Sequence, residues 1–176
     1  MTTILIIIAI LILYIIIQYN YIINLENRIK QSKSGIDVYL TQRFDLIPNL
    51  VECVKTYSKH EENVFTKITE SRSKYFETKN LKDGEVVNKE FKEIIAIGEN
   101  YPELKADEHF LNLEKSLSKI ESQLQAARRI YNSCVTKYNI CINSFPANII
   151  AKLFKFSDED LFEADEEASN NINIKI

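Results

Sequence analysis

The sequence contains few side chains that could perform chemistry, and their spacing matches no catalytic motif. The two histidines are His60 and His109, and the segment HEENV that begins at His60 lacks the second histidine of a zinc-protease HExxH helix. No serine or cysteine lies in a nucleophile motif, and the chain has no glycine-rich phosphate loop. We therefore expect a protein that is not an enzyme and that holds no metal and no cofactor.

The three cysteines are Cys53, Cys134 and Cys141, an odd number that includes no CxxC pair. Cys134 and Cys141 are seven residues apart. On one helix they would share a face and lie too far apart to form a disulfide. We interpret all three as small core residues of a protein in a reducing compartment.

Polar side chains form two stripes at helical spacing, one early and one late in the chain. The first includes Asp45, Asn49 and Glu52, with Arg43 beside it. The second runs from Glu121 through Arg128 and Asn132 to Thr136. Two such stripes can meet across a helix pair. The candidate residues are Arg43, Asp45, Asn49, Glu52, Arg128, Arg129 and Asn132.

These stripes have two interpretations, a structural one and a functional one. In the structural one, Arg128 or Arg129 pairs with Asp45 or Glu52 inside a helical bundle, where a buried ion pair sets the register of the helices. In the functional one, the same groups bind a ligand or a partner. We prefer structural pairing.

The early stripe lies on a segment that a proline interrupts. Apolar residues keep helical phase from residue 36 to residue 57, straight through Pro48, although a proline inside a helix costs roughly 3 kcal/mol. A new helix beginning at Pro48 would need Ile47 as its cap, which is a poor capping residue. We therefore expect one helix kinked at Pro48, and we expect it to run on through Tyr75, since no further glycine or proline occurs before Gly84.

The late stripe lies on a second long helix, predicted over residues 107–145. Asp107 is a plausible N-cap and Pro146 ends the pattern. The apolar seam alternates steps of four and three, as in a coiled coil. Its members are Leu113, Leu117, Ile120, Leu124, Ala127, Tyr131, Cys134, Tyr138, Cys141 and Phe145.

The remaining segments are short. We expect a turn at residues 80–85, a short helix through Phe91 and Ile94, and a loop over residues 98–107. Residues 145–156, FPANIIAKLFKF, read as a short amphipathic helix. Residues 157–168 carry seven acidic and no basic side chains, so we expect a disordered, solvated tail over residues 157–176.

The N-terminal segment predicts a membrane anchor. Residues 4–17 are all apolar, and residues 4–23 would rise about 30 Å as a helix, the thickness of a hydrocarbon core. A cleaved signal peptide is the alternative, but no basic residue precedes the apolar run and no small-residue cleavage site follows it. Basic residues flank the span only on its C-terminal side, which predicts an N-terminus outside the cell and a cytoplasmic domain. They are Arg28, Lys30, Lys33 and Arg43.

Composition supports an all-α protein. The 176 residues include only three glycines and three prolines, with 45% hydrophobic and 27% charged residues. A net charge of −3 argues against a nucleic-acid partner. We expect a transmembrane anchor over residues 1–23, an antiparallel bundle of three to four helices over residues 24–156, and the acidic tail over residues 157–176.

The chain resembles the LemA family in three runs that occur in the family's order. They are GIDVYLTQRFDLIPNLVECVKTYSKHE, ENYPELKADEHFLNLEKSLSKIESQLQAARRIYNSCVTKYN and FPANIIAKLFKF. The resemblance covers nearly the whole chain and implies an antiparallel helical bundle on one transmembrane helix. It implies no established biochemical activity. Family members commonly have two adjacent basic residues where this chain has Gln42 and Arg43.

Two classes of function remain open. The first is a scaffold or interaction module, anchored in the bilayer by residues 4–23 at the cytoplasmic face of a bacterial cell membrane, with a protein partner. The second is a small-ligand sensor or an auxiliary subunit of a membrane enzyme such as a metalloprotease, which the resemblance implies. A pocket lined by Arg128, Arg129, Asp45 and Glu52 would favour the sensor, whereas mutual pairing of these groups would favour the scaffold.

Overall fold

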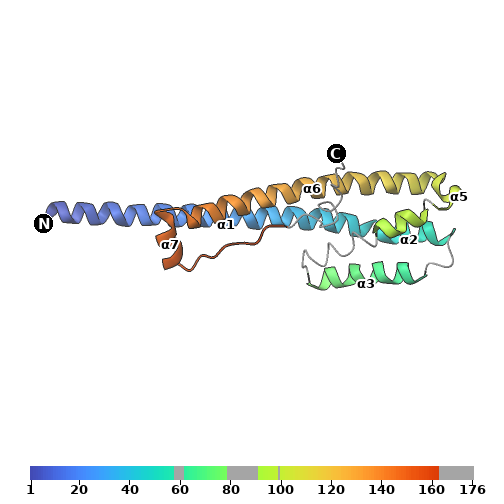
Figure 1. Cartoon of the computed structure of the whole chain (residues 1–176), viewed down its shortest axis with the longest axis horizontal. Helices are drawn as coiled ribbons and strands as arrows, with labels where there is room; N and C mark the ends of the chain where they lie inside the picture. Colours follow the sequence, from blue (N-terminus) through green and yellow to red (C-terminus); the bar gives the residue numbers. More distant parts are fainter. Residues whose placement is uncertain (58–61, 79–90, 99, 163–176) are drawn as a thin grey trace, which may run out of the picture. The chain divides into compact units, whose positions relative to one another are not determined.

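The structure, a computed structural model, describes residues 1–57, 62–78, 91–98 and 100–162, apart from the side chains of Glu62 and Val64. All regular structure in these residues is helical, which confirms the all-α prediction (Figure 1). The helices are α1 (Thr2–Asp45), α2 (Ile47–Lys55), α3 (Glu62–Thr78), α5 (Pro102–Lys105), α6 (Glu108–Asn143) and α7 (Ala147–Leu153), with a further helical segment over residues 91–98. The turn expected at residues 80–85 lies outside the described residues.

The first part of α1 is a candidate membrane-spanning helix. Its most apolar window has a mean hydropathy of 2.6, and none of that window is buried by the rest of the protein. The first fully buried side chain along α1 is that of Ile22. Large apolar side chains before that point are therefore available to lipid, in agreement with the span predicted over residues 4–23.

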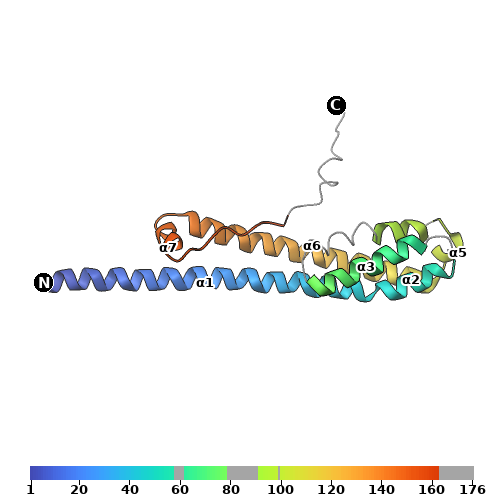
Figure 2. The same cartoon turned by 90° about the horizontal axis from the view of Figure 1, so that it is seen from below.

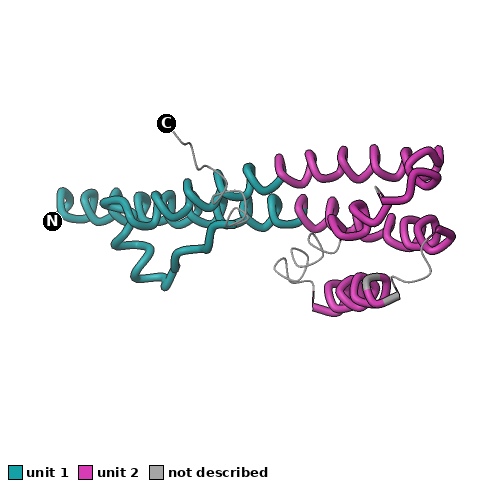
Figure 3. The backbone as a smooth tube through the Cα atoms, turned by 45° about the vertical axis from the view of Figure 1, so that its right-hand side comes forward, with its two compact units in different colours: residues 1–34, 127–176 teal, residues 35–126 magenta. Residues whose placement is uncertain are grey.

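The described chain forms two compact units, and α1 and α6 each contribute to both (Figure 3). Unit 1 consists of residues 1–34 and residues from 127 onward, and unit 2 consists of residues 35–126. The boundary between membrane anchor and bundle, predicted after residue 23, falls inside unit 1.

Unit 1 has a core of apolar side chains from α1, α6 and α7. Tyr131 and Tyr138 of the predicted seam are buried, whereas Cys134 and Cys141 are only half-buried. Phe145 is 80% exposed, because α6 ends at Asn143 and the chain turns before Pro146. The buried side chains are Ile22, Leu25, Ile29, Ala127, Tyr131, Val135, Tyr138, Ile142, Ala147, Ile150 and Ala151.

Unit 2 has a separate core that α1, α2, α3, the 91–98 segment, α5 and α6 share. Leu117 and Leu124 of the predicted seam are buried in it, and Ile120 is half-buried. Phe91 and Ile94, predicted to form a short helix, are both helical and buried. The largest fully buried side chains here are Phe44, Tyr75, Phe91, Phe110, Ile36, Leu40, Ile47, Leu50, Ile68, Ile94 and Leu104.

The structure corrects the prediction of one continuous helix through Pro48. Helix α1 ends at Asp45 and α2 begins at Ile47, with Leu46 between them at φ −83° and ψ −16° and no side-chain cap. Pro48 therefore lies in the first turn of α2, where its missing N–H would have no partner within that helix. Since Leu46 keeps a helical conformation, the apolar stripe keeps its phase across the break.

The structure also corrects the prediction that this helix runs on through Tyr75. Helix α2 ends at Lys55, and the amide of Tyr57 closes a tight turn on the carbonyl of Val54 at 3.0 Å. Figure 1 and Figure 2 show α3 lying beside α2 rather than extending it. Residues 56–61, which connect α2 to α3 in the sequence, include no glycine or proline, so the sequence carries no local signal that the helix ends here.

Helix α6 follows the prediction for residues 107–145 closely. The Oδ1 atom of Asp107 accepts hydrogen bonds from the amides of His109 at 2.8 Å and Phe110 at 3.0 Å. This is the N-cap arrangement predicted for Asp107. The helix then runs from Glu108 to Asn143, which confirms the seam helix apart from its last two residues.

Candidate functional site

Arg43, the cation beside the first predicted stripe, is inside unit 2 and only 7% exposed. Its Nη1 atom donates to Oε2 of Glu121 at 2.8 Å, and its guanidinium lies 4.6 Å from the centroid of the Phe91 ring. Arg43 thus connects α1, α6 and the 91–98 segment. A buried charge that has both a carboxylate and a ring partner sets helix register, and removing either partner would be costly.

Asp45 and Pro48 lie beside a second arginine, Arg72 of α3, which spacing did not single out. Pro48 has no N–H to donate to the carbonyl of Phe44 four residues back. The Nε–H of Arg72 donates to that carbonyl instead, at 3.2 Å. The Arg72 guanidinium also lies 5.0 Å from the Phe76 ring centroid, and its Nη2 atom is 3.9 Å from Oδ1 of Asp45. Because of Pro48, the carbonyl of Phe44 on α1 is thus available as an acceptor, and Arg72 of α3 binds to it.

A buried tyrosine strengthens the contact between α3 and α1. The hydroxyl of Tyr75 donates to Oδ1 of Asp37, and the centroid of the Tyr75 ring lies 4.6 Å from that of the Phe44 ring. Burial, followed by the hydrogen bond and the charge of Asp37, raises the pKa of Tyr75 far above its ordinary value. The hydroxyl therefore remains a donor at physiological pH.

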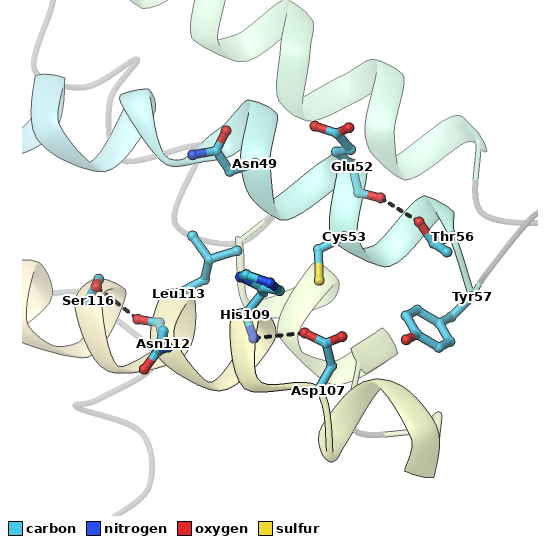
Figure 4. A pocket seen from close by; sticks show the side chains of 10 residues that line it. All are labelled: Asn49, Glu52, Cys53, Thr56, Tyr57, Asp107, His109, Asn112, Leu113 and Ser116. Carbon is cyan, nitrogen blue, oxygen red and sulfur yellow. Dashed lines mark hydrogen bonds between the residues drawn. The ribbon is translucent and has the colours of Figure 1, made fainter.

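Asn49 and Glu52, the other candidates of the first stripe, line an open pocket in unit 2 (Figure 4). The pocket has a volume of about 620 Å³ and lies between α2 and the start of α6. Its lining residues are Asn49, Glu52, Cys53, Thr56, Tyr57, Asp107, His109, Asn112, Leu113 and Ser116. Most of these residues have hydrogen-bonding side chains, and the volume of the pocket is in the size range of ligand sites.

Two ionisable side chains of this pocket, Cys53 and Asp107, influence each other electrostatically. Burial, and then the charge of Asp107, raise the pKa of the Cys53 thiol, so that it stays protonated near neutral pH. Asp107 already accepts two amide hydrogen bonds as the cap of α6. In the part of the chain that the structure describes, no cluster of three His, Cys, Asp or Glu side chains could hold a metal ion.

The candidates of the second stripe, Arg128, Arg129 and Asn132, belong to unit 1. Arg129 is exposed, and the guanidinium of Arg128 lies 5.0 Å from the Phe162 ring centroid. The pairing predicted for Arg128 or Arg129 with Asp45 or Glu52 would join residues of different units, and it stays a prediction.

Asn132 holds the backbone of a segment that follows α7. Its Nδ2 atom donates to the carbonyl of Phe162 at 2.8 Å, and its Oδ1 atom accepts the amide of Phe162 at 2.7 Å. Asn139 binds Glu159 in the same two-bond manner, at 2.8 Å and 3.0 Å. Each side-chain amide therefore satisfies both backbone groups of one residue.

The spacing of the two asparagines matches that of the segment they hold. Seven residues of α6 rise about 10.5 Å, and three extended residues span about 10 Å, so Asn132 and Asn139 meet Phe162 and Glu159 in register. We call residues 158–162 the tail strap. Nδ2 of Asn143 also donates to Asp158 at 2.7 Å. The tail expected to be solvated from residue 157 thus begins with an ordered segment, and residues 163–176 lie outside the described residues.

Sequence reasoning missed Arg72, Asp37 and the tail strap. The one available signal was the repeat of Asn132 and Asn139 at a seven-residue interval on the predicted helix. That interval marks one face, but it does not show what the face binds.

Comparison with known proteins gives three informative relatives. Protein LemA of Metamycoplasma hominis is 27% identical over 146 residues, which cover 80% of this chain and 67% of that protein. Magnetosome protein MamQ 2 of Paramagnetospirillum magneticum is 20% identical over 179 residues, covering 85% of this chain and 66% of that protein. Magnetosome protein MamQ of Magnetospirillum gryphiswaldense is 19% identical over 178 residues, which cover 84% of this chain and 65% of that protein.

The chain spans about two thirds of the length of these curated relatives. A family model described as LemA family matches residues 32–176, which include α6, α7 and the tail strap. This match covers well over half of the chain. The chain therefore belongs to the LemA family.

Proposed function

We propose that this chain is a non-enzymatic interaction module, tethered to a bacterial cell membrane by the first part of α1, whose unit 2 binds a protein partner at the cytoplasmic face. The observation that carries this proposal is the open pocket between α2 and the start of α6, which is lined mainly by residues with hydrogen-bonding side chains. Its size and its hydrogen-bonding lining suit the docking of a polar side chain from a partner.

The positions of the polar and charged side chains in unit 2 support a recognition role for this pocket. Arg43 and Arg72 each contact a ring and an oxygen atom within the unit, so both stabilise the bundle. Asn49, Glu52 and Asn112, in contrast, are exposed at the pocket. The lining residues include two acidic ones, Glu52 and Asp107, and no lysine or arginine, so the charge of the pocket region suits a lysine or arginine side chain of the partner.

The flanking charges of the candidate span support a cytoplasmic orientation. Arg28, Lys30 and Lys33 follow it closely. By the positive-inside rule, these charges favour a cytoplasmic location for the chain that follows the span.

A crosslinking experiment in intact cells tests the proposal on the full chain. A photoreactive amino acid at Thr56 or at Asn112, both exposed at the pocket, should form a covalent adduct with a protein. The same amino acid at Ser73, which is exposed on α3, should not form that adduct. Glu52→Lys should abolish the adduct, whereas Glu77→Lys, the same charge change at an exposed position on α3, should leave it intact.

Equal adduct formation at the pocket and at Ser73, or adducts that survive Glu52→Lys, would contradict the proposal. A small-ligand sensor is the second candidate function, because the pocket volume also suits a small molecule. Native mass spectrometry of the protein released from its membrane distinguishes the two. A bound small molecule that Glu52→Lys removes would favour the sensor.

A further inference from the structure

Unit 1 carries an exposed apolar face around α7. The side chains of Phe145, Ile149, Leu153 and Phe154 are 80%, 60%, 69% and 47% exposed, respectively. The opposite side of α7 is buried through Ala147, Ile150 and Ala151. The helix thus packs on unit 1 with its two alanines and one isoleucine and leaves its bulkiest apolar side chains outside, which a segment facing only water would not favour.

This face lies beside the end of the candidate membrane span. The ring of Tyr19 on α1 is 4.7 Å from the ring of Phe154 and 5.9 Å from that of Phe156. Figures 1 and 2 both place α7 next to this part of α1. Tyrosine rings gather at the boundary between headgroups and acyl chains. Tyr19 therefore marks the depth at which α7 would meet a bilayer.

The charges near α7 suit the same surface. Lys152 lies in α7 and Lys155 lies two residues after its end, and both side chains are exposed. The chain leaves α7 in a left-handed turn, with Lys155 at φ 59°. It then runs along α6 from Asn143 towards Asn132, away from the end of α6 that precedes α7. Asp158 stays beside Asn143, close to α7, whereas Glu159 is held at Asn139 and the rest of the tail strap lies farther back along α6. Most of the strap's acidic charge is thus held away from the apolar face, and Lys152 and Lys155 lie beside that face.

We propose that α7, with the flanking Phe145 and Phe154, is an interfacial helix that inserts its exposed apolar face into the headgroup boundary of the same bilayer that α1 spans. The proposal rests on the membrane tether of the proposed function. Helices with an apolar face and lysines at its edge lie in the interface plane, held by buried apolar area and by anionic headgroups. Unit 1 then has two attachments to the membrane, the span and α7.

Tryptophan fluorescence tests this arrangement directly, because the chain contains no tryptophan. Three single-tryptophan variants of the full chain, Leu13→Trp, Leu153→Trp and Ile130→Trp, are reconstituted into phosphatidylcholine and phosphatidylglycerol vesicles with lipids brominated at a shallow or a deep acyl position. All three positions are more than half exposed in the structure, so the larger side chain is accommodated.

Each reporter has a distinct expected result. Leu13→Trp should be quenched most by deep bromine, since residue 13 lies in the middle of the span. Leu153→Trp should be quenched severalfold more by shallow than by deep bromine. Ile130→Trp lies thirteen residues before the end of α6, about 20 Å along the helix, and should be quenched by neither.

The outcomes separate the two proposals. Leu13→Trp quenched but Leu153→Trp as unquenched as Ile130→Trp would overturn the interfacial helix and leave the tether intact. An unquenched Leu13→Trp would refute the tether, while quenching at Leu153→Trp would still support lipid contact by α7. Leu153→Trp shielded from both brominated lipid and aqueous iodide would show that protein covers this face, which also overturns the proposal.

Discussion

Replacing Arg72 by methionine tests whether Pro48 creates an attachment point for α3. Phe44 is fully buried, and its carbonyl receives the Nε–H of Arg72 at 3.2 Å because Pro48 has no N–H to donate. Methionine keeps a long apolar stem but removes the donor. The carbonyl of Phe44 then becomes a buried acceptor that has lost its donor, which is a costly state.

The expected loss follows from the contacts of Arg72. A hydrogen bond from a charged donor contributes about 1.5–3 kcal/mol, and the length of this bond and the 33% exposure of the side chain favour the lower half of that range. The stacking on Phe76 adds about 0.5–1 kcal/mol. The Asp45 carboxylate, 3.9 Å away and largely exposed, adds little. We expect Arg72→Met to cost about 2–3 kcal/mol.

A double-mutant cycle with Pro48→Ala isolates the shared carbonyl. Alanine at position 48 supplies an N–H to the carbonyl of Phe44, and Leu46 is already close to helical geometry. In that background Arg72→Met should cost only about 1 kcal/mol, from the lost ring contact and the lost packing of its stem. The coupling between the two sites should therefore be about 1–2 kcal/mol.

Hydrogen exchange of the full chain in nanodiscs measures these effects as local opening free energies of α3. Lys67→Met is the matched control, since it removes a positive charge from an exposed position of the same helix. Additivity of Pro48→Ala and Arg72→Met within about 0.5 kcal/mol would refute the idea that the proline frees this acceptor.

Four further predictions follow from other contacts. Asn132→Asp places a charged acceptor where the Nδ2 donor faces the carbonyl of Phe162, so hydrogen exchange of the Phe162 amide should become at least about tenfold faster. Asn112→Asp, at an exposed position of α6, should leave the exchange rate of the Phe162 amide unchanged. Because Tyr75 has a raised pKa in the folded state, its contribution to stability is complete below its unfolded pKa of about 10 and is lost as pH rises above that value. Tyr75→Phe should therefore reduce the fall in the unfolding free energy of unit 2 above about pH 10. An unchanged dependence of that free energy on pH would contradict the assignment. Lys155→Gly should raise the local opening free energy at the end of α7 by about 1 kcal/mol, because Lys155 has a positive φ that glycine adopts without strain. Lys152→Gly, inside the helix, should lower that opening free energy. With the proposed orientation, a membrane-impermeant maleimide should label none of Cys53, Cys134 and Cys141 in intact cells under mild unfolding, and labelling before the membrane is opened would reverse the topology.

Several features of this protein could be predicted from the sequence because they depend on local order alone. The apolar run over residues 4–17 defines a candidate span by length and hydropathy, and no partner is needed to recognise it. The sequence predicts Asp107 as a cap because a cap acts on amides two and three residues away. It predicts the seam of α6 because the apolar period repeats over many turns, although the buried seam shifts to Val135 and Ile142 near its end.

The partners of the polar side chains, in contrast, were decided by tertiary structure. Arg43 meets Glu121 across 78 residues of sequence, and Arg72 meets the carbonyl of Phe44 across 28. Both contacts depend on where the chain reverses after α2, and that reversal carries no glycine or proline to mark it. Helical spacing places side chains on one face of a helix, but it does not tell which helix covers that face. That depends on the path of the chain between helices, so only the folded structure shows that Asn132 and Asn139 hold the tail strap.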